Sequence, residues 1–555
     1  MVHKKGSIVV RDLLVLTGLL SILFFSFLGN RPLAAPDEGR YVEIPREMVE
    51  TGDYVTPHLN GLVYFEKPPL FYWIETLPIR WFGIQEAPLR FPLAFLALFG
   101  CLLTYFFVQR LYDRATGLWA TGVLGCAFLY NVLGRLITLD MGFSVFLGGA
   151  LLAFLTATEE SSPKKRRGWM AFSSFCCAAA VLTKGLAGLA LPGLIVLLWT
   201  LLTRRWYLLR FLFLPSSIFL FLLIILPWHL LVALKNPGFF NFYFLHEHFT
   251  RYLTTVHRRF QPFWFFIPVI FIGFLPWVSF LFRSVSSVFP RSRKQCQENP
   301  KDLFFLLWVF VPFLFFSISH SKLIPYILPI FPALAVLTAH FIQKHLRNRH
   351  SLRGEILGYS FLCLAMIAGI TFFLTKVNPE FQELFRSFLF PLYGILGISS
   401  VGIPLLRLWK GDRIAIYSIG TSGVALLMLL IQMGPHIPRL SIKPLAQKFL
   451  TIMPKETQVF SYIAYYQDLP PYLNRTIQVV NWYGELLFGT EADPLQKQVI
   501  SYQEFERAWK QAPWACVFCR QDRYQELIKH SWFTPLLLGT HDGQVLACNQ
   551  VPEKR

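Results

Sequence analysis

The residues of this chain that could do chemistry gather just after its first long apolar run. The stretch AAPDEGRYVEIPREM carries Asp37, Glu38 and Glu43, and the stretch YFEKPPLFYW adds Glu66 and Lys67. A chain that is sparing with charge places ionisable groups beside a bilayer where something is bound or cut. Carboxylates can act as bases or metal ligands, and a lysine can stabilise an anion. We therefore predict a functional site at this membrane surface.

A second group of ionisable residues lies in segment 234–262. This segment follows another long apolar run and carries basic residues and histidines together: Lys235, His246, His248, Arg251, His257, Arg258 and Arg259. One or two such side chains could simply reach lipid headgroups. Their interleaving with Glu247 and many aromatic residues favours an anionic ligand, because lysine and arginine pair with phosphate.

Two aspartates fall at the predicted outer ends of helices. Asp37 follows the first apolar run, and Asp140 lies in RLITLDMGF after the third. Two such carboxylates could bind a metal, or one could take a proton from an acceptor. Alternatively, Asp37 and Glu38 could cap an interfacial helix, and Asp140 could be an ordinary polar residue at the end of a span.

Two further pairs could contribute to the same site. Glu66 and His248 offer a carboxylate and an imidazole on different outer loops, which suits either a divalent cation or a simple hydrogen-bonded pair. Lys322 and Tyr326 open an apolar run in SHSKLIPYILPIFPALAVL. They are four residues apart, so we expect them to share one helix face. There they would either anchor the helix at the interface or line a donor site.

The elements that must position these residues are membrane-spanning helices. The chain has 555 residues, of which 54% are hydrophobic and only 15% charged, with a mean hydropathy of +0.47. A soluble protein carries about 25% charged residues. We predict thirteen spans, near 9–29, 90–109, 115–133, 137–157, 169–183, 185–203, 208–233, 263–282, 303–318, 323–342, 355–375, 387–407 and 413–434.

Basic loops then indicate which side each loop faces. Positive residues cluster at the N-terminus and in four loops that thirteen spans place on the same, cytoplasmic side: 164–167, 204–205, 291–294 and 344–353. The net charge of +20 is therefore explained by orientation, and we expect no nucleic-acid partner. We expect a transmembrane part over 1–434, with outer loops 30–89 and 234–262.

The tail, residues 435–555, is expected to form a soluble α/β domain on the outer side. Its β-rich runs alternate with helical ones. Cys516 and Cys519 form a CxxC with Cys548 nearby, but no second CxxC or histidine pair completes a zinc site. A pair of strand cysteines, or a disulfide if the region is exported, is the simpler interpretation.

The outer location limits the reaction. That side offers no ATP or nucleotide sugar, so a group transfer there must use a donor activated within the membrane. A polyprenyl-phosphate sugar meets this need, since its tail lies in lipid and its phosphate lies at the surface. The leaving phosphate requires cationic stabilisation, which Lys67, Arg251, Arg258 or a metal could supply.

These motifs together resemble a known family. PDEGRYVEIPREM, YFEKPPLFYW, HEHFTRY and SKLIPYILPIFPALA are similar to segments of the bacterial aminoarabinose transferases, which are GT-C glycosyltransferases related to the protein O-mannosyltransferases. The resemblance extends along the whole chain. It implies transfer of 4-amino-4-deoxy-L-arabinose from undecaprenyl phosphate to lipid A phosphates in the bacterial inner membrane, a modification linked to polymyxin resistance.

The resemblance also implies residue roles. It assigns catalytic or positioning roles to Asp37, Asp140 and Lys67, and a divalent-metal site, usually zinc, to Glu66 and His248. Contacts with the carrier phosphate fall to a larger set: Tyr64, Lys67, Arg251, Arg258, Lys322 and Tyr326. The partners are then the lipid-linked donor, lipid A and membrane lipids, and we expect a monomer.

Alternatives remain open. The acceptor could be a protein or polysaccharide hydroxyl, which needs a base, whereas a phosphate acceptor needs its repulsion from the donor phosphate screened. The basic surplus of the outer loops favours the phosphate. A lipid-linked sugar transporter would place ionisable groups near the bilayer midplane. Lys184 in LTKGLAG instead lies near a predicted turn between spans.

Overall fold

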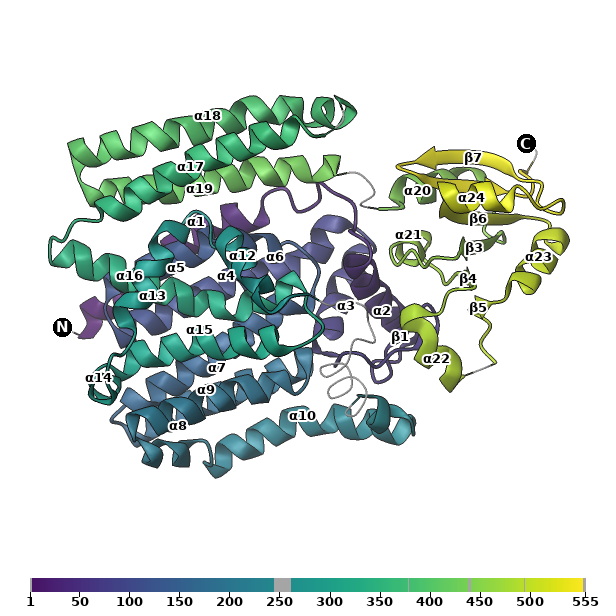
Figure 1. The fold of residues 1–555 in the computed structure, drawn as a ribbon. Coiled ribbons are helices and arrows are strands. Elements are labelled where there is room, and N and C mark those ends of the chain that lie inside the picture. Colours follow the sequence, from purple (N-terminus) through teal and green to yellow (C-terminus); the bar gives the residue numbers. More distant parts are fainter. Residues whose placement is uncertain (1, 244–260, 378, 438–440, 494, 553–555) are drawn as a thin grey trace. The chain divides into compact units, whose positions relative to one another are not determined.

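The computed structural model describes residues 2–243, 261–377, 379–437, 441–493 and 495–552. Its described residues form two compact units. Unit 1 draws on Met1–Phe27, Leu93–His229 and Phe244–His436, and unit 2 on Leu28–Pro92, Leu230–Tyr243 and Ile437–Arg555. The two units are described separately below, and Figure 1 labels the elements of both.

Unit 1 is built from long apolar helices, several of which end at residues suited to helix termini. Helix α8 begins with proline, and Gly185 directly after it has a φ of 80°. The helices of the membrane part, two of which also contribute residues to unit 2, are α1 (Val2–Phe25), α4 (Glu86–Leu111), α5 (Arg114–Cys126), α6 (Phe128–Leu133), α7 (Leu139–Glu159), α8 (Pro163–Lys184), α9 (Ala187–Thr203), α10 (Pro215–Lys235), α12 (Phe266–Gly273), α13 (Val278–Val288), α15 (Pro300–Ile318), η4 (Ile324–Ile330), α16 (Phe331–Arg347), α17 (Arg353–Leu374), α18 (Pro379–Lys410) and α19 (Asp412–Met433).

The chain is a multi-span membrane protein. Each predicted span contains a helix, but by length and composition nine helices of the described residues can cross a membrane, or up to ten if one bent pair is a single span. The bent pair is α12 and α13, which meet at 117°. The span predicted at 115–133 is interrupted at Ala127, whose backbone is extended. The count of thirteen therefore stays a prediction.

The first part of unit 2 is helical with one small hairpin. Helix α2 spans Asp37–Thr51 and α3 spans Leu70–Phe82. Between them β1 (His58–Leu59) and β2 (Leu62–Val63) pair through Asn60 and Gly61, both at positive φ, as Asn-Gly hairpins do. The Asn60 side chain exchanges two hydrogen bonds of 2.9 Å with the backbone of Ile477. This hairpin is therefore fixed to the C-terminal part of the same unit.

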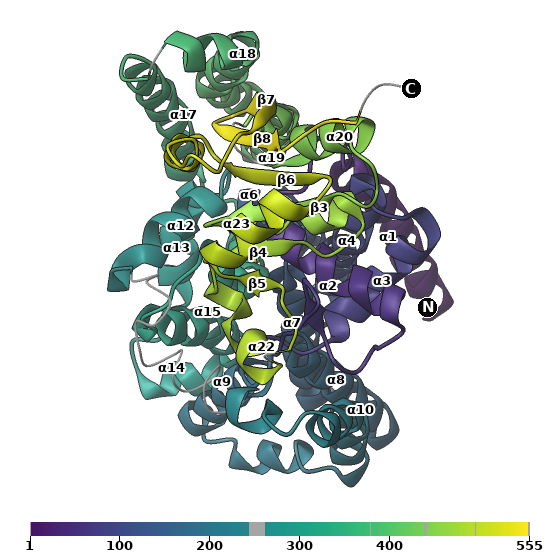
Figure 2. The ribbon, with the colours of Figure 1, turned by 90° about the vertical axis from the view of Figure 1, so that its right-hand side faces the viewer.

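The second part of unit 2 is the expected α/β domain. Its six strands lie in the order β5-β4-β3-β6-β8-β7, as Figure 2 shows from bottom to top. Strands β3 to β6 are parallel where they pair, and β8 pairs antiparallel with β6 and β7. The elements are α20 (Lys443–Ile452), β3 (Gln458–Tyr462), α21 (Leu469–Leu473), β4 (Gln478–Val480), α22 (Leu487–Ala492), β5 (Val499–Ile500), α23 (Tyr502–Gln511), β6 (Ala515–Arg520), α24 (Gln521–Leu527), β7 (Leu536–His541) and β8 (Gln544–Cys548).

One of the three cysteines noted in this domain stays free, and the other two form a disulfide. It joins Cys516 on β6 to Cys548 on β8, which lie opposite each other in the sheet. Cys519 stays a free, buried thiol in the domain core beside Phe505 and Trp509. The CxxC spacing therefore does not describe the bond, because Cys516 and Cys519, three positions apart on β6, point to opposite faces of the sheet.

Candidate active site

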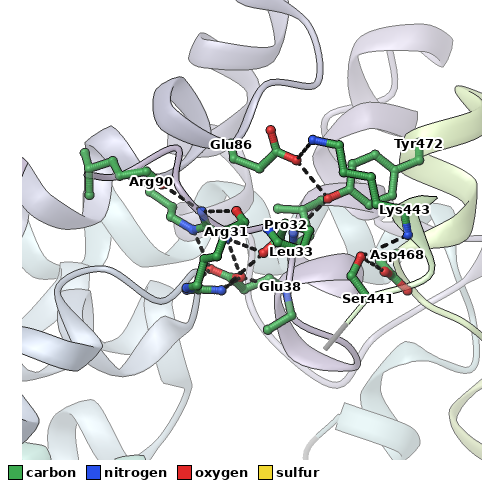
Figure 3. Close-up of polar contacts among 12 residues, drawn as sticks. Arg31, Pro32, Leu33, Glu38, Glu86, Arg90, Ser441, Lys443, Asp468 and Tyr472 are labelled. Atoms are coloured by element: carbon green, nitrogen blue, oxygen red, sulfur yellow. Dashed lines mark hydrogen bonds and ion pairs between the residues drawn. The ribbon is translucent and has the colours of Figure 1, made fainter. Parts of the chain in front are cut away.

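The PDEGR motif is held in place by a buried carboxylate. Glu38 is fully buried, and its oxygens accept hydrogen bonds from Arg31 at 2.5 and 3.0 Å and from Arg90 at 2.8 and 3.0 Å (Figure 3). The backbone N–H of Ala34 adds a bond of 2.7 Å. Burial alone would raise the pKa of Glu38, but the two guanidiniums lower it to about 2. The cap of α2 is Pro36, with no side-chain bond, so Glu38 is a structural ion rather than a helix cap.

A second network in Figure 3 joins this loop to the C-terminal part of unit 2. Glu86 forms an ion pair with Lys443 and accepts a hydrogen bond from the Tyr472 hydroxyl at 2.9 Å. That hydroxyl in turn accepts a bond of 2.7 Å from the backbone N–H of Leu33. Because Glu86 and Tyr472 each contact two partners, these contacts fix the position of the loop before α2.

The two parts of unit 2 approach each other closely at Gly39. A Cβ on this residue would come within 2.4 Å of the backbone nitrogen of Asp468, so only glycine fits. Asp468 is itself fully buried and accepts bonds from the Ser441 hydroxyl at 2.5 Å and the Ile442 N–H at 2.9 Å. Burial raises the pKa of Asp468 to about 6.

Asp37 lies one residue before Glu38 in a different environment. Its side chain is 43% exposed and lies 3.8 Å from Nη1 of Arg40. Arg40 is buried, and its Nε lies 2.5 Å from Oε2 of Glu485, which also accepts a bond of 2.8 Å from Gln467. Burial raises the pKa of Glu485, against the opposing effect of Arg40. The structure therefore presents Asp37 as an accessible carboxylate beside a buried arginine that a second carboxylate holds.

The FEKPP segment lies close to the same arginine. The Lys67 ammonium donates to the Glu66 backbone oxygen at 2.6 Å. Tyr64 and Tyr72 are buried, and neither hydroxyl has a hydrogen-bond partner among the described residues. Burial and the nearby Glu66 carboxylate raise the pKa of Tyr64, and Arg40 opposes the shift. Both phenols thus remain neutral donors, and unit 2 brings Asp37, Tyr64, Glu66 and Lys67 into one neighbourhood.

Unit 1 holds a separate group of predicted residues. Asp140, in the first turn of α7, forms an ion pair with Lys184, the last residue of α8. The Lys184 ammonium also lies 4.3 Å from the ring centre of Tyr326 in η4 and 5.1 Å from that of Phe143. Sequence reasoning placed Lys184 at a turn but gave it no role. The sequence did carry a signal that could have pointed to Lys184, because positive charge is unusual at a turn on the expected outer side.

The prediction that Lys322 and Tyr326 share one helix face is wrong. Lys322 precedes η4 in extended backbone, so it shares no helix face with Tyr326. Its ammonium instead donates to the backbone oxygens of Ser319 at 2.6 Å and Gln261 at 2.8 Å. Burial lowers its pKa. The proline at 325 opens a 3₁₀-helix only after the lysine, which explains the error.

Three predicted residues lie outside the described part of the chain: His248, Arg251 and Arg258. Among the described residues, no group of three or more His, Cys, Asp or Glu side chains is arranged to hold a metal ion. The predicted metal pair of Glu66 and His248 therefore stays a prediction, because His248 lies outside the described residues.

Comparison with known proteins shows which protein families this chain resembles. Residues 16–243 match the family of dolichyl-phosphate-mannose-protein mannosyltransferases, and residues 445–545 match the aminoarabinose transferase C-terminal domain. The undecaprenyl phosphate-α-4-amino-4-deoxy-L-arabinose arabinosyl transferase of Shewanella sediminis is 30% identical over 520 residues, which cover 88% of this chain and 90% of that protein. The proteins of that name from Aeromonas hydrophila and Edwardsiella ictaluri are 33% and 34% identical. Those matches cover 63% and 59% of this chain, and 65% and 59%, less than two thirds, of the relatives' lengths.

A solved structure agrees over nearly the whole chain. The crystal structure of ArnT from Cupriavidus metallidurans bound to undecaprenyl phosphate has 28% sequence identity to this chain and a TM-score of 0.85. The match covers 97% of this chain and 98% of that one. With matching helices, a matching C-terminal domain and a relative aligned over nearly its full length, the chain belongs to the family of undecaprenyl phosphate-α-4-amino-4-deoxy-L-arabinose arabinosyl transferases.

Proposed function

We propose that this protein transfers 4-amino-4-deoxy-L-arabinose from undecaprenyl phosphate to a phosphate of lipid A, at the outer face of the bacterial inner membrane. The observation that carries the proposal is the near-complete match to the Shewanella sediminis transferase, whose name states donor and sugar. The Cupriavidus metallidurans structure holds the carrier, undecaprenyl phosphate. The membrane-spanning helices suit a donor whose tail lies in lipid.

We propose direct attack by a lipid A phosphate oxygen on the anomeric carbon, with inversion. The bond from that carbon to the donor phosphate breaks, and undecaprenyl phosphate leaves with the electron pair. Lys67, Arg251 and Arg258 stabilise the charge that develops on the leaving group. Since the acceptor is already an anion near neutral pH, no residue must deprotonate it. The accessible carboxylate of Asp37 and the paired carboxylate of Asp140 would then orient the sugar and acceptor.

The remaining predicted contacts complete the donor site. Tyr64 offers a buried neutral hydroxyl, which suits a phosphate or sugar oxygen. The Tyr326 ring, held against Lys184, and the Lys322 ammonium are assigned to the carrier phosphate. This assignment requires these groups to face the periplasmic side. It also requires a cytoplasmic N-terminus and a periplasmic domain over 435–555.

A divalent metal, with zinc the expected ion, is proposed at Glu66 and His248. When bound, it would supply positive charge near the donor phosphate. The test is metal content by mass spectrometry of purified protein after dialysis, comparing Glu66→Gln and His248→Ala with Glu50→Gln, whose carboxylate is exposed. Equal metal in the unaltered protein and all three variants would remove this site from the proposal.

The function is tested by mass spectrometry of lipid A from cells with and without the protein. We expect an added aminopentose mass only when the protein is present, and lost in Asp37→Asn. Purified protein with the lipid-linked aminopentose and lipid A should form the same product. Unmodified lipid A in both experiments would contradict the proposal.

A second candidate follows from the match of residues 16–243 to the protein mannosyltransferases. In that case the acceptor is a protein hydroxyl, and a carboxylate such as Asp37 must act as its base. Glycopeptide analysis of the same cells distinguishes the two, because a hexose or pentose on serine or threonine would appear in place of modified lipid A.

A further inference from the structure

An open apolar groove runs along unit 1 between α1, α5 and α19. Its volume is about 750 Å³. Leucines and isoleucines of α1 form one wall, and α5 and α19 form the other two. Several of these apolar side chains are exposed, including Leu19 at 63% and Ile22 at 67%. The rings of Trp119 and Tyr417, which bridge α5 and α19, stack with centroids 4.6 Å apart.

Only one end of the groove is charged. Arg114 begins α5 and Arg413 lies in the first turn of α19, with Gln343 of α16 beside them in the lining. Arg114 is paired with Asp12 but keeps 49% of its side chain exposed. Arg413 is exposed and has no ion pair with any described residue. The lining farther along α19, through Val424 to Met428, is apolar.

The groove is long enough for a lipid chain. The lining residues of α19 run from Arg413 to Met428, which at 1.5 Å per residue is about 22 Å. One leaflet of the hydrocarbon core is about 15 Å thick. A chain bound along the groove would therefore reach through one leaflet while its headgroup stayed beside the guanidiniums.

We propose that this groove binds one anionic phospholipid, with its phosphate between Arg114 and Arg413 and an acyl chain along α1, α5 and α19. Exposed guanidiniums at the mouth favour a negatively charged headgroup over a zwitterionic one. The stacked Trp119 and Tyr417 rings give the chain a flat apolar wall. This lipid is a separate ligand from the donor. Arg114 and Arg413 adjoin loops predicted to be cytoplasmic, whereas Asp140 and Lys184 adjoin predicted outer turns.

A glycine in the groove allows the site to be filled. A Cβ at Gly122 on α5 would meet no atom within 4 Å, so Gly122→Leu places its side chain in the open groove. Gly397→Leu on α18 is the matched control, because its Cβ also meets nothing within 4 Å and Gly397 does not line the groove. Arg413→Gln removes the unpaired charge alone and tests the mouth independently of how Gly122→Leu folds.

The experiment is native mass spectrometry of the full-length protein released from nanodiscs of phosphatidylglycerol or phosphatidylcholine. We expect the unaltered protein and Gly397→Leu to retain one phosphatidylglycerol, and Gly122→Leu to retain none. Arg413→Gln should weaken phosphatidylglycerol binding about five-fold, as one guanidinium near an anionic lipid predicts. Equal retention by Gly122→Leu, or equal retention of phosphatidylcholine by the unaltered protein, would overturn the proposal.

Discussion

Lys184, at the end of α8, forms an ion pair with the carboxylate of Asp140, and only 10% of each side chain is exposed. The same ammonium lies over the Tyr326 ring. Three turns far apart in the sequence therefore meet at one lysine. A buried ion pair of this kind does little for stability by itself, but removing one partner leaves the other charge unpaired. Asp140 thus depends on Lys184 for the direction of its carboxylate.

Replacing Lys184 should disable transfer. We expect Lys184→Met to lower kcat/KM for aminopentose transfer by about 100-fold, a typical loss when a positioned charge leaves a catalytic site. Lys301→Met, which breaks the more exposed pair with Glu159 in the same unit, should stay near the unaltered rate. The double variant Asp140→Asn with Lys184→Met should be no slower than the slower single variant, since paired residues are not additive. Additive losses would show that the two residues act separately.

Neutralising Glu38 should loosen unit 2. Glu38→Gln leaves Arg31 and Arg90 without their shared carboxylate, and loss of one partner of a buried pair destabilises by about 3–5 kcal/mol. Limited proteolysis between residues 30 and 92 should therefore be faster. Glu50→Gln is the control, because Glu50 is 60% exposed in its pair with Arg46. Equal cleavage of both variants would contradict the structural role of Glu38.

Asp468 and Glu38 should give opposite pH dependence. The pKa of Asp468 is about 6 in the folded protein against an ordinary value of 3.8. Between these two pH values its carboxyl is therefore protonated in the folded state and ionised in the unfolded state. The folded state then binds more protons than the unfolded one, and stability from this group falls as the pH rises from about 4 to 6. Asp468→Asn should flatten the thermal midpoint across that range.

Glu38 shifts the other way. Its folded pKa of about 2 lies below the ordinary 4.5, so its stabilising effect is complete above pH 4.5 and is lost as the pH falls toward 2.

The prediction for Asp468 has its own test. A thermal midpoint of Asp468→Asn that follows the unaltered protein at every pH from 4 to 7 would remove Asp468 from this account.

Reduction of the disulfide should weaken the C-terminal domain. Cys516 and Cys548 are 32 residues apart, and closing a loop of this size stabilises a fold by roughly 4 kcal/mol in the chain-entropy model. Cys516→Ala with Cys548→Ala should lower the domain's thermal midpoint, whereas Cys519→Ser, which leaves the bond intact, should respond to reductant like the unaltered protein. Calorimetry with and without reductant measures both effects.

Local patterns in the sequence were sufficient to predict most elements and failed where distant partners decide. Hydropathy placed a helix within each predicted span, and β-rich runs placed β3, β4, β6 and β8, because both signals depend on neighbouring residues. Strand β5 has only two residues, and β7 is largely exposed, so neither has a clear pattern.

The site was harder to predict for the same reason. Charge near the first span drew attention to Asp37 and Glu66, but it could not separate the accessible carboxylate of Asp37 from the buried one of Glu38 beside it. One of the two arginines that hold Glu38, Arg90, reaches it from α4, and the carboxylate that holds Arg40, Glu485, comes from the tail. Such long-range pairs leave no local periodicity.

The contact at Gly39 gives this protein a built-in order of assembly. Helix α2 is synthesised early, yet the backbone it rests on, at Asp468, and the carboxylate that holds Arg40, at Glu485, are synthesised after most of the helices. Until Glu485 is synthesised, Arg40, which lies beside Asp37, lacks the carboxylate that holds it. A nascent chain stalled on the ribosome before residue 485 would thus already carry its membrane helices and still lack the contact that holds Arg40.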